Sequence, residues 1–313
     1  MYWTCGTLIL LISGIKAGVF LKPGGVPVAP PMNAPANAKT GNHLHWGYKD
    51  LIDEEPPTAW EKDYPSCKGT FQSPISINRS VVQLDPTLKP LRFSNYHEHP
   101  VDNTWTILDN GHSVQFNATF PAGKTPTITT DRNNDSFALT QFHFHWGSDD
   151  SRGSEHVVDG KRYPLELHLV HQKTTEDAAA AGKDTTGLAV VAVMFSLAGP
   201  KDHPNIFLNM ITEALEQAKP VPDKPITRKL SFLNLAVLWT IMKPMLKISE
   251  KQINIFRHLH GKADDPKDLL EDNFRPIQDV HGRIIKAYSA DPSRKGNDVV
   301  KAATALAAER KKV

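Results

Sequence analysis

Three histidines on two short segments of alternating side chains constrain this chain more than any other feature. The first segment reads Gln-Phe-His-Phe-His at residues 141–145, and the second reads Glu-Leu-His at residues 166–168. Side chains alternate between the two faces of a β-strand, so His143 and His145 project from the same face. If the two segments are neighbouring strands, His168 points to the same place. Three imidazole nitrogens and one open position are the ligand set of a catalytic zinc ion, Zn²⁺.

Two further side chains stand where the partners of zinc-bound histidines are found. Gln141 and Glu166 each lie two residues before a histidine and therefore project from the same strand face as that histidine. A carboxamide or carboxylate oxygen at this place accepts the ring N–H and fixes the orientation of the imidazole. The alternative is that these are ordinary histidines of a sheet. We consider it weaker, because three unpaired imidazoles would destabilise a buried strand.

The rest of the chain is rich in predicted strands. β-Branched and aromatic runs such as 104–108, 113–116 and 188–197 are short and are separated by Asn-Gly, Pro and Asp clusters. Helical spacing appears at 205–215 and 249–253. The net charge of +2, with both signs mixed along the chain, leaves no basic stripe that would bind a nucleic acid. We predict one mainly β domain with short peripheral helices.

The segment from residue 141 to residue 171 resembles the signature of the α-class carbonic anhydrases. Further motifs of that family match in the same order: His45-Trp46-Gly47-Tyr48, Gln72-Ser73-Pro74-Ile75, Asn110-Gly111-His112, Gly187-Leu188-Ala189-Val190, Val237-Leu238-Trp239-Thr240 and Asn273-Phe274-Arg275-Pro276. The resemblance covers residues 42–290 and implies a twisted, mostly antiparallel ten-stranded sheet with the zinc in a deep cone. It also implies a zinc lyase that reversibly hydrates carbon dioxide to bicarbonate and a proton.

The resemblance implies roles for single residues as well. His112 matches the residue that carries protons out of the cone, and an imidazole titrating near pH 7 suits that task. The alternative is that His112 simply belongs to the turn that the preceding Asn-Gly pair starts. Asn273 matches the residue whose backbone carbonyl supports His145. The apolar wall beside the substrate matches four residues that would otherwise be assigned to the core: Val170, Val190, Val237 and Trp239.

One part of the family pattern is missing. Between Leu235 and Ala236 the family normally carries a segment with Gly-Ser-Leu-Thr-Thr-Pro-Pro, and its threonine orients the hydroxide on the zinc. Glu155 matches the acid that orients this threonine, so it loses its expected partner. The segment also forms a strand of the central sheet, which could therefore be one strand short. A splice variant, a gene-model error and true divergence would each explain the gap.

The two ends of the chain carry separate signals. Residues 1–20 contain a short apolar run followed by small residues, which indicates a secretory signal peptide, with an apolar strand as the alternative. Residues 21–41 read as a flexible Pro- and Gly-rich lead-in, and residues 291–313 as a basic helical or disordered tail. No segment is long and apolar enough to serve as a membrane anchor. We therefore expect a soluble, secreted protein. Three Asn-x-Ser/Thr patterns are possible glycan acceptors on that route: Asn78, Asn117 and Asn134.

Cys67 would have no partner within the secreted chain. The chain has two cysteines, and Cys5 would leave with the signal peptide. In disulfide-bonded members of the family, the partner cysteine follows the segment that is missing here. We therefore expect a free thiol at Cys67 or a bridge between two chains.

Two functions remain for the whole chain. The first is a secreted zinc carbonic anhydrase whose activity the missing segment could impair. The second is a zinc-binding secreted or matrix protein with weak or no turnover. The intact zinc ligands favour the enzyme and the missing threonine favours the second function; we favour the enzyme.

Overall fold

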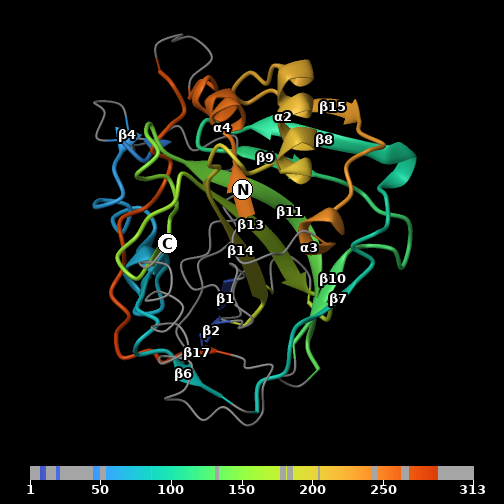
Figure 1. Ribbon diagram of the computed structural model, residues 1–313. Coiled ribbons are helices and arrows are strands. Elements are labelled where there is room, and N and C mark those ends of the chain that lie inside the picture. Colours follow the sequence, from blue (N-terminus) through green and yellow to red (C-terminus); the bar gives the residue numbers. More distant parts are fainter. Residues whose placement is uncertain are drawn as a thin grey trace.

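The computed structural model in Figure 1 describes residues 8–11, 19–21, 45–49, 54–85, 87–130, 134–176, 181, 186–203, 205–240, 246–261 and 268–287. Of residues 8–11, 19–21, 45, 239 and 240 only the backbone is described. The predicted tail at 291–313 and nearly all of the predicted lead-in at 21–41 lie outside the described residues.

One open, twisted sheet forms the centre of the structure (Figure 1). Its longest strands lie next to one another in the order β8 (Thr104–Asp109), β9 (Val114–Asn117), β11 (Ser136–Trp146), β13 (Leu165–Lys173) and β14 (Leu188–Leu197). All four pairings between these neighbours are antiparallel. Shorter strands extend the sheet: β1 (Leu8–Leu11), β2 (Val19–Leu21), β6 (Gln83–Leu84), β7 (Arg92–Ser94), β10 (Thr127–Thr129), β15 (Ile226–Lys229), β16 (Leu246–Ile248) and β17 (Ile285–Ala287).

The predicted fold class is confirmed. The described part of the chain is mostly strands in a mostly antiparallel, open sheet, and helices are few and peripheral. Within the described residues the sheet has 13 strands rather than ten, because short strands such as β6 and β17 add to its margins. Two separate two-stranded sheets pair β3 (His45–Trp46) with β4 (Glu54–Glu55) and β5 (Ser76–Ile77) with β12 (Val157–Val158).

The longer helices cover one side of the sheet. The two longer ones are α2 (Ile206–Ala218) and α4 (Glu250–Arg257), with α3 (Val237–Thr240) and the 3-10 turns η1 (Pro65–Lys68) and η2 (Val101–Asn103) as short additions. Both longer helices begin where the sequence predicts. Asn205 accepts the Leu208 N–H at the start of α2, and Ser249 forms a capping box with Gln252 at the start of α4.

The alternation of side chains separates the core from the predicted metal ligands. Phe142 and Phe144 of β11 are fully buried on the helix side, where their rings contact Phe207 of α2 and Phe256 of α4. Leu165, Leu167 and Leu169 of β13 belong to the same core cluster. The residues between them must therefore point to the opposite side of the sheet. This apolar pattern fixes the register, since a shift by one residue would bury the histidines under the helices.

In the described part of the chain, β14 has neighbouring strands along both of its edges. Along one edge β14 pairs with β13, and along the other it pairs in parallel with β1 and with β16. The gap between Leu235 and Ala236 left open whether this sheet would be one strand short. In the structure, the chain after the gap forms the short helix α3, and β1 from the N-terminal segment lies beside β14.

Cys67 bears on one expectation. It is disulfide-bonded in the structure of the whole chain, whereas the predicted free thiol or bridge between chains concerns the chain without residues 1–20 and stays a prediction. Cys5, the other cysteine of the sequence, lies outside the described residues. Within residues 1–20, the structure describes β1 and the first two residues of β2 as strands.

Candidate metal centre

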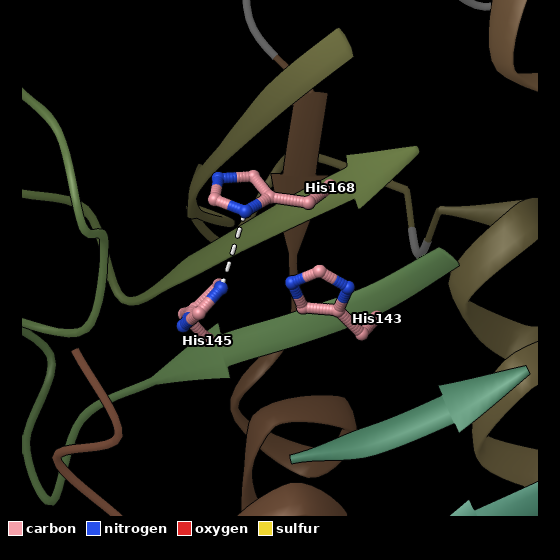
Figure 2. A group of neighbouring side chains, drawn as sticks. All are labelled: His143, His145 and His168. Atoms are coloured by element: carbon pink, nitrogen blue, oxygen red, sulfur yellow. Dashed lines mark hydrogen bonds between the residues drawn. The ribbon is translucent and has the colours of Figure 1, made fainter. Parts of the chain in front are cut away.

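The pairing of β11 with β13 brings the three predicted ligands together. His143 lies directly opposite His168 in the antiparallel register, and His145 follows on the same face of β11. Each histidine offers one ring nitrogen, and these three nitrogens all lie within 4.8 Å of one another. Figure 2 shows the three rings turned toward a common point, two from β11 and one from β13. The arrangement could hold a metal ion, as the alternation in the sequence predicts.

Three hydrogen-bond acceptors determine which ring nitrogens are left for a metal. The Gln141 Oε1 atom lies 2.9 Å from Nδ1 of His143. The backbone carbonyl of Asn273 lies 2.7 Å from Nδ1 of His145, and Glu166 Oε1 lies 2.7 Å from Nε2 of His168. Because these oxygens accept hydrogen bonds, each histidine donates from the named nitrogen and leaves its other nitrogen without a proton when neutral.

The remaining nitrogens have the spacing of zinc ligands. His145 Nε2 and His168 Nδ1 are 3.2 Å apart (Figure 2). In a tetrahedral zinc site with Zn–N distances of about 2.0–2.1 Å, ligand nitrogens lie about 3.3 Å apart. Two unprotonated nitrogens at this distance repel each other unless a cation or a proton lies between them. The residues present therefore fit a zinc ion.

The electrostatic surroundings favour the neutral form at two of the three histidines and act differently on the third. Burial lowers the pKa of His143 well below its ordinary value and also lowers the pKa of His145, which keeps both rings neutral. Burial acts in the same direction on His168, but the negative charge and hydrogen bond of Glu166 outweigh it and raise the pKa of His168. Burial alone would raise the pKa of Glu166, yet His156 and His168 hold it well below its usual range. An anionic Glu166 makes His168 a more basic ligand.

His156 is a member of this network that the sequence interpretation missed. Its Nδ1 donates to Glu166 Oε1 at 2.7 Å, and its backbone N–H donates to Glu166 Oε2 at 2.9 Å. His156, Glu166 and His168 also lie close enough to form a second metal-binding group. Because their facing atoms are already joined by hydrogen bonds, we interpret this group as the support of His168. The signal was available in the motif at 153–164, where His156 follows Glu155.

Asn273 connects the end of β11 to the turn that carries His112. Its side chain accepts the Trp146 N–H at 2.7 Å and donates to the backbone carbonyls of His112 and Phe144 at 3.0 and 3.2 Å. Its own carbonyl holds His145. The side chain is buried, so these bonds are shielded from water. One residue, 128 positions from His145 in the sequence, thus positions both a ligand and the predicted proton carrier.

His112 lies in a tight turn and stacks on an aromatic ring. Its ring centre is 3.6 Å from that of Trp46, with the planes 17° apart. Gly111 has φ +76°, a conformation that favours glycine, and the Asn110 side chain accepts the N–H groups of His112 and Ser113. The turn expected as the alternative is therefore present. The turn does not conflict with the predicted role in proton transfer, since that role would belong to the ring of His112 and the turn is formed by its backbone.

The predicted apolar wall is brought together only in part. Val170 and Val190 are buried and lie directly opposite each other in the β13–β14 pairing, on the sheet face that carries His168. Val237, on α3, packs instead against the main core cluster with its neighbours Leu235 and Leu238. The side chain of Trp239 lies outside the described residues.

Glu155 points one carboxylate oxygen at the metal centre. Its Oε1 accepts the backbone N–H of Arg275 at 3.0 Å. Its Oε2 lies 3.7 Å from His145 Nε2, a predicted ligand atom. The guanidinium group of Arg275 in turn donates to Gln72 Oε1 and to the Ser73 carbonyl. Glu155 is therefore held beside the three histidines although the threonine segment is absent.

Comparison with known proteins identifies the family of this chain. The family model described as eukaryotic-type carbonic anhydrase matches residues 55–237 and 233–289. The chain belongs to the carbonic anhydrase family. The two matched stretches meet at 233–237, where the expected threonine segment is missing.

The similarity to curated relatives extends over almost the whole length of those relatives. It is 34% identical over 274 residues to carbonic anhydrase 7 of Mus musculus and, equally, of Homo sapiens, a span of 79% of this chain and 98% of each relative. It is 32% identical over 266 residues to carbonic anhydrase 3 of Bos taurus, covering 77% of this chain and 97% of the relative. Among the described residues, no helix combines the length and apolar character needed to cross a membrane.

Proposed function

We propose that this carbonic anhydrase is a zinc enzyme that catalyses the reversible hydration of carbon dioxide to bicarbonate and a proton. The observation that carries the proposal is the convergence of three histidine nitrogens whose protons have been directed away by Gln141, Asn273 and Glu166. Such a set binds zinc and leaves one position open. Family membership supports the reaction for the family as a whole.

Each part of the site has a task in this proposal. When bound, zinc lowers the pKa of a coordinated water to about 7 and so supplies hydroxide at neutral pH. His143, His145 and His168 would hold the ion. Val170 and Val190 would give carbon dioxide an apolar surface beside His168. His112 would then pass the released proton to buffer, a task for which imidazole chemistry is suited.

Two observations favour a low rate of carbon dioxide hydration and support the second function, that of a zinc-binding matrix protein. The segment with the orienting threonine is missing between Leu235 and Ala236. Val237 packs in the main core rather than beside Val170 and Val190. A protein of this kind could bind zinc and hydrate carbon dioxide slowly, or serve as a zinc-binding matrix protein without useful turnover.

Secretion is part of the proposal. It is supported by the apolar run and small residues within 1–20 and by the acceptor patterns at Asn78, Asn117 and Asn134. Asn78 and Asn134 are exposed, as glycan acceptors must be. Expression in a secretory cell line tests it. We expect the protein in the medium, with a mobility that changes on glycosidase treatment, whereas retention of the unmodified chain inside the cells would contradict secretion.

The catalytic proposal is tested by stopped-flow hydration of carbon dioxide with the purified full-length chain. We expect a rate above the buffer background that disappears with a chelator, returns with zinc and is absent in His145→Ala. His97→Ala is the matched control, because His97 lies in an exposed loop. Zinc binding without hydration would support the matrix function, and failure to bind zinc would contradict both.

A further inference from the structure

We propose that Glu155 Oε2 directly accepts a hydrogen bond from the water at the open side of the three histidines. It would take the place of the threonine hydroxyl that the family's missing segment supplies. This inference rests on the proposed function, because it assumes that a metal ion and its water occupy the centre. The family resemblance gives Glu155 only an indirect role, through the threonine.

The carboxylate is fixed where this contact requires it. Glu155 is buried, and its Oε1 is held by the Arg275 N–H at 3.0 Å. The backbone around Glu155 is held as well, because Arg162 donates to the Glu155 carbonyl at 3.3 Å. With one oxygen fixed, the carboxylate cannot rotate without losing a buried hydrogen bond. The other oxygen therefore remains directed at His145 Nε2, 3.7 Å away.

The distance favours a contact to water over coordination of the metal. A carboxylate ligand would lie about 3.3 Å from each of the other ligand atoms of a tetrahedral zinc. Among the described residues, two groups have ligand atoms that all lie within 4.8 Å of one another, and neither the group of the three histidines nor the second group includes Glu155. Glu155 Oε2 is thus near one ligand atom and farther from another. This places it beside the coordination sphere, where it can accept a hydrogen bond from a water within that sphere.

Charge also favours this use of Glu155. A buried carboxylate destabilises the fold unless it has hydrogen bonds or a positive partner. The Arg275 backbone N–H satisfies one oxygen, and the Arg275 side chain is itself buried. A metal ion with a polarised water would supply the second oxygen with a strong donor. Glu155 would act as a positioning residue for the water. The resemblance to the family implies that a threonine hydroxyl and this carboxylate together position the water there.

The test compares Glu155→Gln and Glu155→Asp with the full-length wild-type chain. Each protein is loaded with Co²⁺, and its visible absorption is recorded against pH to find the midpoint at which the bound water loses its proton. Zinc affinity is measured by competition with a chelator, and hydration of carbon dioxide by stopped flow. Glu213→Gln is the control, because Glu213 is an exposed carboxylate on α2, on the other side of the sheet.

We expect Glu155→Gln to bind zinc within about threefold of wild type and to lower the absorption midpoint, because a nearby negative charge opposes ionisation of the water. Hydration should fall by about 10²-fold, as for loss of one preorganised partner. Glu155→Asp keeps the charge but withdraws the oxygen by about 1.5 Å, so its midpoint should stay close to wild type while the rate falls. If the glutamine variant does not fold, Glu155→Asp alone provides the test. A hydration rate of Glu155→Asp equal to that of wild type would then overturn the inference.

Two results would overturn the inference in the glutamine variant. An absorption midpoint identical to wild type would show that Glu155 does not face the water. A hundredfold loss of zinc affinity would show that it is a metal ligand instead. The proposed function fails separately, if the wild type binds Co²⁺ with a pH-dependent spectrum but does not hydrate carbon dioxide. A midpoint that still moves in Glu155→Gln would then support the contact without the activity.

Discussion

Asp109 gives the clearest prediction of how stability depends on pH. It ends β8, just before the turn of His112, and its side chain is fully buried. Burial raises its pKa from 3.8 to about 7; the Gly111 N–H works against this, and Asp223 adds to it. We predict that Asp109→Asn stabilises the protein, and increasingly so as the pH rises. The asparagine oxygen can still accept the Gly111 N–H, which lies 3.0 Å from Asp109 Oδ1.

The sign follows from proton binding. Below the unfolded pKa of 3.8 both states hold the proton, so the raised folded pKa causes no loss of stability there. Between 3.8 and about 7 only the folded state holds it, and the wild type loses about 1.36 kcal/mol of stability per pH unit. The loss is complete above the folded pKa. From pH 5 to pH 8 it covers roughly two units, or about 3 kcal/mol, which the asparagine variant would not suffer.

Urea unfolding at pH 5 and pH 8 measures this effect. The stability difference between Asp109→Asn and wild type should grow by about 3 kcal/mol between the two values, and any pH dependence of zinc binding is common to both proteins. Glu216→Gln, an exposed carboxylate on α2, should show no such growth. A difference that is the same at both pH values would refute the reasoning, because Asp109 would then titrate alike in the folded and unfolded chains.

Three further predictions concern the metal centre, the gap and the disulfide. Gln141→Ala should weaken zinc binding by about 10- to 100-fold in a chelator competition, since it removes the acceptor that orients His143; unchanged affinity would contradict that role. Inserting the family's threonine segment between Leu235 and Ala236 should raise the hydration rate at least about a hundredfold, and an equal rate without it would show that the gap is harmless. Thiol titration of the denatured, unreduced protein should find no free thiol in the full-length chain and one, Cys67, in a variant that starts at residue 21.

The ligand set is the part of the site that the sequence predicts best, because it depends on local geometry. Alternation along a strand fixes the faces of His143 and His145, and Phe142 and Phe144 fix which face is buried under the helices. The acceptors Gln141 and Glu166 stand two residues from their histidines and follow from the same rule. The mainly β fold follows from short β-branched runs in the same way.

Contacts between distant segments of the chain are harder to predict from the sequence. The bond from the Asn273 carbonyl to His145 spans 128 positions, and only the family resemblance indicated it. His156 was missed because its contact with Glu166 depends on how the loop at 153–164 folds back on β13. The packing of Val237 in the main core depends on where the chain goes after the gap, and the bonding of Cys67 depends on Cys5, 62 positions earlier in the sequence. Periodicity contains no information on such long-range choices.

The central claim is that three histidine nitrogens hold one zinc ion with an open fourth position. Zinc K-edge X-ray absorption of the full-length chain, loaded with one equivalent of zinc, tests it most directly. The claim predicts three nitrogen ligands and one oxygen at about 2.0–2.1 Å, and loss of this pattern in His145→Ala. A sulfur ligand at about 2.3 Å, or the same spectrum in wild type and His145→Ala, would contradict it.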